Sequence, residues 1–513
     1  MSATRENDGN SVNGRVEENG TGEVAVSRPL AWYKRLAYGV GHVQNDLCAS
    51  MWLTYLIVFL TKVLGFDPGR AGTLVLIGQL TDAVATPLVG LESDRVDMWP
   101  FCIRIGRRRL WHIFGTICVS LSFPFLFRRC FACDVNVGQT SDLVQLVYYT
   151  PFVVIFQIGW ASVQIAHLAL IPELSSCQHE RITLNSIRYG FTVIANIAVF
   201  VAMWVVLGYD PHHRDVTPHD ETFFLIVAVS VVVGGLFFSF FFQIFTKEPL
   251  PAHIRLRRDG AKEDANGVVP DVAPSQTMTW REWLKNLQFY EVGLMYMCSR
   301  LYTNITQTYL PLYILETQHF NKSYIAIIPL VVYVSGFAAS FALSFQIVSR
   351  LFGRRACSLL GLVIGAGSCV WLWFHNLHEQ IFGVSILLGV SSTIMMVTSL
   401  AMAADLINTS TESGAFVFGV MSFFDKVSTG IAIQLVQWYQ PPECPPDVAD
   451  CYPRDLYFRY VMVFVSGGAL IMASFALMLL WPQQIGHRGP TGNANQAQPN
   501  EDDQDRLVDE LES

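Results

Sequence analysis

Six charged side chains lie inside stretches of the chain that are otherwise apolar. They are Asp46, Asp82, Arg188, Arg300, Asp425 and Lys426. A charged side chain at the centre of a lipid bilayer costs roughly 2.5–3.5 kcal/mol on insertion scales. Six of them facing lipid would cost on the order of 15 kcal/mol, the upper end of the whole stability of a protein. We therefore expect these side chains to face inward, where they pair with one another or line a wet cavity.

Polar side chains recur along the same stretches at the spacing of one helix face, about every four residues. His42, Asp46, Ser50 and Thr54 form one such stripe, and Gln79, Asp82, Thr86 and Gly90 form another. Isolated Ser and Thr residues are better explained as hydrogen bonds between helices, whereas the charged residues favour a translocation path. The predicted substrate- and ion-binding residues are Asp46, Asp82, Arg188, Lys426, Arg300, Asp425, His42, Asn45, Gln164, Asn196 and Thr86. Among them, His42 stands one turn before Asp46 and is the candidate for proton sensitivity.

Composition points to the membrane as the solvent of this chain. Of its 513 residues, 52% are hydrophobic and only 15% are charged, where soluble domains carry about 25%. The mean hydropathy is +0.36. The lipid bilayer is therefore the expected partner, and no nucleic acid is expected. No HExxH, GxSxG or paired-aspartate protease motif stands in the apolar stretches, so the chain is not expected to be an enzyme, and no metal site or cofactor is predicted beyond a possible coupling proton.

Twelve apolar segments are long enough to cross a bilayer, which takes about 20 helical residues each. Because the apolar runs are continuous, helices are favoured over a barrel, whose strands would alternate. The predicted spans are 36–62, 71–92, 110–127, 143–171, 186–207, 222–245, 286–313, 323–349, 356–375, 380–404, 415–438 and 456–481. The fold class is therefore an all-α membrane protein.

Charge in the loops sets the orientation and divides the chain. Residues 1–30 are polar and lack the apolar core of a signal peptide, so the N-terminus is expected in the cytosol. Lys and Arg gather on the loops that lie on the same side of the membrane as the N-terminus, and an even number of spans places the C-terminus there as well. The predicted parts are a disordered tail 1–30, a six-helix bundle 31–246, a linker 247–285, a second six-helix bundle 286–481 and a disordered tail 482–513. A Gly-Arg-Arg sequence at Gly106 returns at Gly353 in the same relative place, which indicates an internal repeat.

Four cysteines fall on the loops predicted to face away from the cytosol. They are Cys130, Cys133, Cys444 and Cys451. These loops pass through an oxidising compartment, so disulfides are favoured over a zinc site, with three pairings possible.

The loop after the second span resembles a known family signature. Gly90-x-x-x-Asp94-Arg95 followed by Gly106-Arg107-Arg108-Arg109 is similar to the inner-loop motif of the major facilitator superfamily. The resemblance implies two six-helix bundles that work by alternating access, with a charge lock at the cytosolic face. The implied inner gate is Asp94, Arg95, Arg107, Arg108 and Arg109. The insertion 96–105 between the two parts is typical of the glycoside–pentoside–hexuronide cation symporter branch.

The first two spans also resemble melibiose permease of that branch, in Tyr38-Gly-Val-Gly, Asp46 and Asp82-Ala. Arg188, and Lys426 within FFDKVSTG, match charged site positions of the same relative. The chain departs from the sodium-binding pattern, because Thr86 and Gln164 stand where the bacterial proteins carry further acids. The departure favours proton coupling or facilitated exchange over sodium coupling.

Five further stretches resemble a vertebrate branch of this superfamily that carries cysteine into lysosomes and melanosomes and is tied to pigmentation. They are NDLCASMWLTYL (45–56), IFQIGWASVQIAHLALIPEL (155–174), IPLVVYVSGF (328–337), VTSLAMAADLI (397–407) and SGAFVFGVMSFFDKV (413–427). This resemblance implies cysteine as substrate, a lysosomal and melanosomal location and a monomer. The alternatives are a sugar or lysophospholipid symporter, or a receptor or scaffold that keeps the fold without transport. If the chain transports an amino acid, the substrate's carboxylate would be held by Arg188, Lys426 or Arg300. The substrate's ammonium group would be held by Asp46 or Asp82.

Overall fold

The computed structural model describes residues 30–94, 105–131, 142–175, 177–209, 214–248, 279–344, 346–374, 377–407, 414–442 and 454–485. Within these residues all regular structure is helical. In hydrocarbon, a helix satisfies its backbone N–H and C=O groups within one segment, so long apolar runs fold this way. The tails, most of the linker and the loop 95–104 lie outside the described residues.

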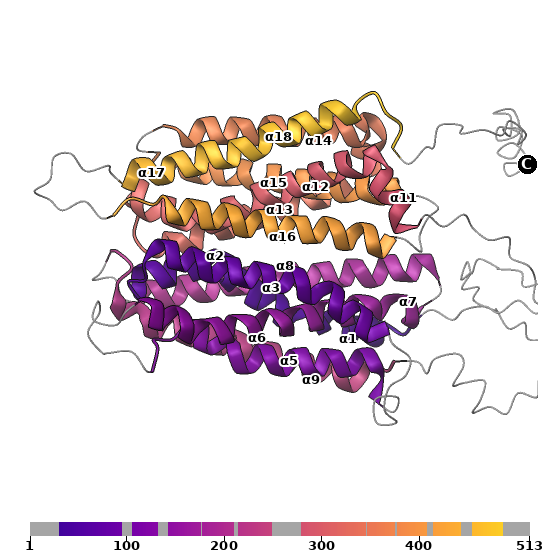
Figure 1. Ribbon diagram of the computed structural model, residues 1–513, viewed down its shortest axis with the longest axis horizontal. Coiled ribbons are helices and arrows are strands. Elements are labelled where there is room, and N and C mark those ends of the chain that lie inside the picture. Colours follow the sequence, from indigo (N-terminus) through magenta and orange to yellow (C-terminus); the bar gives the residue numbers. More distant parts are fainter. Residues whose placement is uncertain are drawn as a thin grey trace, which may run out of the picture.

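The helices of the first half of the chain form one bundle, drawn from indigo to magenta in Figure 1. Its elements are α1 (Trp32–Gly39), η1 (Val40–His42), α2 (Val43–Val58), η2 (Phe59–Val63), α3 (Pro68–Asp94), α5 (Arg107–Leu126), α6 (Asp142–Ala169), α7 (Ile171–Leu174), α8 (Gln178–Gly208), η3 (Pro218–Asp220) and α9 (Glu221–Phe245). We call this the N-terminal bundle.

The helices of the second half lie beside it and run from red to yellow in Figure 1. They are α11 (Trp280–Lys285), α12 (Leu287–Leu312), η4 (Tyr313–Thr317), α13 (Tyr324–Ser344), α14 (Gln346–Leu372), α15 (Gln380–Ile407), α16 (Gly414–Trp438), α17 (Arg454–Tyr460), η6 (Val461–Val465) and α18 (Ser466–Leu480). We call this the C-terminal bundle. The short helix α11 begins with a capping box between Thr279 and Glu282.

The prediction of an all-α membrane protein is confirmed. Among the described residues, 11 helical segments are long and apolar enough to cross a membrane. The predicted span at 286–313 corresponds to α12, which has 26 residues but is not among those segments. Its composition explains the difference, since α12 carries Arg300, Asn304 and other polar residues that face the protein interior.

Two glycines with left-handed backbone mark equivalent places in the two bundles. Gly106 precedes α5 with φ of 102°, and Gly353 interrupts α14 with φ of 71°. Only glycine adopts these angles without steric cost. In both bundles the arginines that follow turn back onto the same bundle, as Arg108 does toward Glu173 and Arg354 toward Asp405. The equivalent geometry fits the internal repeat.

Helices α13 and α15 approach each other most closely at Gly389. A Cβ atom there would meet the Val332 carbonyl oxygen and Ser335 Oγ at less than 3.0 Å. We expect Gly389→Ala to lower the free energy of unfolding by about 1–3 kcal/mol, the usual cost of overpacking. Thermal unfolding in detergent measures this, with Gly367→Ala as control because nothing lies within 4 Å of a Cβ at Gly367. Equal Tm values for the two variants would contradict the close approach of α13 and α15.

Candidate functional site

A cavity of about 240 Å³ lies between the two bundles. The N-terminal bundle contributes residues of α2 and α8, and the C-terminal bundle contributes residues of α12, α13 and α15. Its lining residues are Leu53, Tyr189, Thr192, Val193, Asn196, Arg300, Thr303, Asn304, Thr306, Gln307, Leu310, Pro329, Val332, Tyr333, Gly336, Phe337, Gly389, Ser392, Thr393 and Met396. A cavity made by both bundles changes shape whenever the bundles rotate against each other, as alternating access requires.

Asp46 stands directly behind the wall of this cavity. Its carboxylate is 6% exposed and accepts a hydrogen bond at 2.9 Å from Thr192 Oγ1, which lines the cavity. The other oxygen lies 2.9 Å from Nδ1 of His42, one turn earlier. Beside this pair, Ser50 Oγ donates to Asn196 Oδ1. The first polar stripe predicted from the sequence therefore faces α8 and reaches the cavity through Thr192 and Asn196.

Asn45 and Gln164 make hydrogen bonds inside the N-terminal bundle. Asn45 Nδ2 donates to the carbonyl oxygen of Trp160 at 3.0 Å, which joins α2 to α6. Trp160 Nε1 donates to Gln164 Oε1 at 2.9 Å within α6. Neither Asn45 nor Gln164 lines the cavity.

Arg300 brings a positive charge to the opposite wall. Its Nε lies 3.0 Å from Asp425 Oδ2, and Asp425 is 3% exposed. Asn304 Nδ2 donates to Asp425 Oδ1 at 3.2 Å and to Thr429 Oγ1 at 3.0 Å. Arg300 and Asn304 line the cavity, whereas Asp425 stands behind them and orients both side chains.

Asp82, Thr86 and Lys426 form an ion-paired contact between the bundles. Lys426 Nζ on α16 lies 2.5 Å from Asp82 Oδ2 on α3, and it donates to Thr86 Oγ1 at 3.0 Å. Thr86 Oγ1 in turn donates to Asp82 Oδ1 at 3.0 Å. The lysine and aspartate side chains are only 12% and 9% exposed, and none of the three residues lines the cavity. The predicted residues therefore divide between the cavity wall and this separate contact.

Arg188 lies on α8, one turn before Thr192. Its Nε is buried and makes no hydrogen bond to the described residues. The guanidinium interacts electrostatically with Tyr38 and with His167 of the same bundle. Arg188 is therefore a half-buried cation whose Nε has capacity left for an anionic group.

The arginines of the predicted inner gate tie helices of the N-terminal bundle together. Arg107 and Arg108 form ion pairs with Glu173 at 3.2 Å and 2.8 Å, and the backbone N–H groups of Arg108 and Arg109 donate to Glu248. Burial raises the pKa of Glu248, against these backbone hydrogen bonds, which lower it. Asp94 ends α3, but its side chain and all of Arg95 lie outside the described residues.

Ion pairs between the bundles gather at the other end of the molecule. Lys62 pairs with Glu316, and Lys322 Nζ lies 2.7 Å from Asp220 Oδ1. Gln434 Nε2 also donates to the carbonyl oxygen of Gly69 at 3.1 Å. We call the end of the molecule where these three contacts join the bundles the paired end. The sequence did not point to these two ion pairs, because each of the four charged residues stands in a short loop or near a helix end, where a charge is common.

The cavity residues of α13 and α15 were not among the predicted site residues either. Tyr333, Ser392, Thr393 and Met396 line the cavity, but they stand in strongly apolar segments that carry no charge. The Ser391-Ser392-Thr393 run was the available signal. Gln307 was missed as well, and its Nε2 donates across the bundles to Thr54 Oγ1 at 3.1 Å.

Cys130 is disulfide-bonded. The other disulfide candidates, Cys133, Cys444 and Cys451, lie outside the described residues. Within the part of the chain that the structure describes, no group of three or more His, Cys, Asp or Glu side chains is placed to hold a metal ion.

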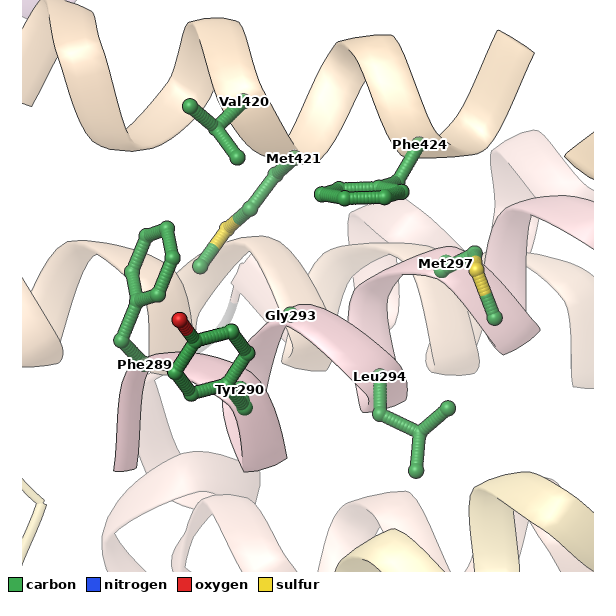
Figure 2. Close-up of a pocket in the computed structure, with 8 residues that line it drawn as sticks. All are labelled: Phe289, Tyr290, Gly293, Leu294, Met297, Val420, Met421 and Phe424. Carbon is green, nitrogen blue, oxygen red and sulfur yellow. The ribbon is translucent and has the colours of Figure 1, made fainter. Parts of the chain in front are cut away.

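A second hollow of about 170 Å³ lies between α12 and α16. Figure 2 shows its walls, which are apolar side chains apart from the Tyr290 hydroxyl. That hydroxyl donates to the carbonyl oxygen of Leu284 at 2.8 Å. With no charged residue in its lining, this hollow does not belong to the polar site.

Comparison with known proteins places the chain among transporters. The family model described as MFS/sugar transport protein matches residues 37–439. Major facilitator superfamily domain-containing protein 12 from Mus musculus is 42% identical over 477 residues, covering 90% of this chain and 96% of the relative. The Homo sapiens protein of the same name is 40% identical over 481 residues, with 90% and 96% covered. Among solved structures, a partially occluded inward-open form of the xylose transporter XylE from E. coli has a TM-score of 0.59 at 14% identity, covering 88% of this chain and 98% of that one.

Proposed function

Because the chain belongs to the major facilitator superfamily and is a secondary transporter of that fold, not an enzyme, we propose that it moves cysteine by alternating access. The observation that carries the substrate class is the charge around the cavity between the bundles. Arg300 lines one wall, Asp46 stands behind Thr192 on the other, and Arg188 lies one turn away. A zwitterion needs one cation and one anion on opposite sides, and charge-assisted hydrogen bonds give the strongest orientation.

Size supports a small substrate. Ligand pockets for drug-sized molecules measure roughly 300–1,000 Å³. At about 240 Å³, this cavity fits an amino acid better than a lysophospholipid, whose acyl chain needs a wide apolar channel. The apolar part of the wall, with Leu53, Val332, Phe337 and Met396, suits a short thiol side chain. Cysteine itself, among small zwitterions, comes from the resemblance to the vertebrate cysteine-carrying branch.

The proposed direction is from the cytosol into the lumen of lysosomes and melanosomes, with both termini in the cytosol. Under this orientation the paired end faces the lumen. The ion pairs Lys62–Glu316 and Asp220–Lys322 join the two bundles there, whereas Arg35–Glu180 and Arg354–Asp405 at the cytosolic end each join parts of one bundle. Such contacts fit a state closed toward the lumen.

A sugar is the second candidate, because the cavity also carries the neutral hydroxyl and amide groups that sugars use. These are Thr192, Asn196, Thr303, Asn304, Gln307, Ser392 and Thr393. A sugar has no charge to pair with Asp46 or Arg188. Competition by an unlabelled sugar or by an unlabelled amino acid therefore separates the two candidates.

We expect purified protein in liposomes to take up radiolabelled cysteine. The variants Asp46→Asn and Arg188→Ala are each expected to lower this uptake about tenfold or more, because each loses a charge-assisted contact of about 1.5–3 kcal/mol with the substrate. Glu379→Gln and Arg281→Ala remove exposed charges of the same sign and serve as matched controls. Wild-type uptake in both site variants contradicts the assignment of Asp46 and Arg188. Competition by unlabelled melibiose but not by serine favours the sugar candidate.

A further inference from the structure

Three buried histidines lie together in the N-terminal bundle, beyond the cavity wall. His42, His112 and His167 come from η1, α5 and α6, and they are 5%, 0% and 0% exposed. The ring centroids of His42 and His167 are 5.7 Å apart, and those of His112 and His167 are 6.2 Å apart. Cysteine binding as proposed above uses none of these rings directly.

Hydrogen bonds fix His112 as a neutral ring. Its Nε2 lies 2.8 Å from the carbonyl oxygen of Gly41, which only accepts, so Nε2 carries the hydrogen. Its Nδ1 lies 2.9 Å from Nε2 of Gln243, which donates, because the Gln243 oxygen is taken by Arg109. Both nitrogens of His112 are therefore satisfied without a second proton.

His42 and His167 each keep one nitrogen without a partner. His42 Nδ1 faces the Asp46 carboxylate and His167 Nε2 faces the Tyr38 carbonyl oxygen at 2.8 Å, so these two nitrogens carry the hydrogens. The remaining nitrogens, His42 Nε2 and His167 Nδ1, are buried and find no hydrogen-bond partner among the described residues. A buried acceptor that faces no donor is costly, and a proton added at His42 removes one such acceptor and makes a ring that pairs with the Asp46 carboxylate 2.9 Å away.

The surroundings limit this pair to a single proton. Asp46 bonds directly to His42 and stabilises a positive ring there, while Arg188 on α8 opposes a positive charge on His167. Tyr38 on α1 stacks on His167 with centroids 4.3 Å apart, and His112 on α5 stays neutral. Two imidazolium rings 5.7 Å apart would repel each other in a low dielectric, so the second proton is excluded.

We propose that His42 and His167 together hold one proton, and that the ammonium group of the substrate displaces it by competing for Asp46. The proposal rests on the zwitterionic substrate proposed above. A substrate ammonium group that replaces Thr192 at Asp46 Oδ2 brings a second positive charge to the carboxylate whose Oδ1 faces His42, and this disfavours the charged His42 ring. The proton then leaves to solvent through the cavity, so substrate and proton occupy the protein in turn. By linkage, each lowers the affinity for the other, which is the behaviour of an exchanger.

Proton release tests this directly. Full-length protein in nanodiscs, in weakly buffered solution with a pH dye, is mixed with cysteine. We expect the wild type to release about one proton per cysteine bound under conditions where the pair is charged, and His42→Gln and His167→Gln to release none. Both glutamines retain a donor toward Asp46 or Tyr38, which protects the fold. His112→Gln and the exposed His219→Gln are the controls and are expected to release the proton as the wild type does.

A second measurement keeps the proton site separate from the choice of substrate. Potentiometric titration of substrate-free protein between pH 5 and 8 is expected to show about one more proton bound by the wild type than by the double His42→Gln/His167→Gln variant. Equal proton binding overturns the site. Cysteine binding without proton release from a wild type that titrates as expected overturns the competition. Failure of the wild type to bind cysteine contradicts the proposed substrate, and the titration still decides the proton site.

Discussion

Replacing Lys426 by alanine is expected to lower cysteine uptake about tenfold or more and to destabilise the protein by about 3–5 kcal/mol, the cost of leaving one buried charge of an ion pair unpaired. Lys426 pairs with Asp82 at 2.5 Å between side chains that are 12% and 9% exposed. Without the ammonium group, the Asp82 carboxylate keeps the Thr86 hydroxyl as its one hydrogen-bond partner among the described residues. Uptake in liposomes and Tm in detergent measure the two effects.

The double variant Asp82→Asn/Lys426→Met separates stability from transport. Removing both charges avoids the unpaired carboxylate, so we expect the Tm to recover most of the loss. Uptake is expected to stay low, because the pair lies between α3 and α16 and must open and close as the bundles move. Lys247→Ala, which removes an exposed charge, is the control. Full uptake by the double variant would show that the pair serves stability alone.

A disulfide across the paired end is expected to stop transport completely and reversibly. A Cβ atom at Gly72 would lie 2.8 Å from the Cβ of Gln437, so α3 and α16 touch there. Disulfides need Cβ atoms roughly 3.5–4.5 Å apart, which a shift of about 1 Å provides. In the Gly72→Cys/Gln437→Cys variant, oxidation would hold the two bundles together at that end, and alternating access requires them to separate there.

Uptake before oxidation, after oxidation and after reduction with dithiothreitol measures the effect in one preparation. Each single-cysteine variant, treated in the same way, controls for side reactions of the native free cysteines, among them Cys118 and the exposed Cys177. A cross-linked protein, verified by mass spectrometry, that still transports cysteine would rule out opening at the paired end.

The apolar runs determined the helical membrane fold by themselves. Hydrocarbon leaves a long apolar segment few alternatives to a helix, so the positions of the helices followed from local composition. The exception was α12, where Arg300 and Asn304 lower the apolar content of a helix that packs inside the protein. The cost of an unpaired charge in lipid also predicted that six charged residues would pair or line a cavity. The structure pairs Asp82 with Lys426, Asp425 with Arg300, and Asp46 with His42, whereas Arg188 Nε has no hydrogen-bond partner among the described residues.

Only the tertiary structure decided which charge pairs with which. Asp425 and Lys426 are neighbours in the sequence, yet Asp425 turns to Arg300 within its own bundle and Lys426 crosses to Asp82 in the other. Successive residues of a helix point about 100° apart, so their partners depend on which helices flank α16, and no local pattern encodes that. The same holds for the rings of His42 and His167, which are 125 residues apart in the sequence and lie close together only because η1 packs against α6.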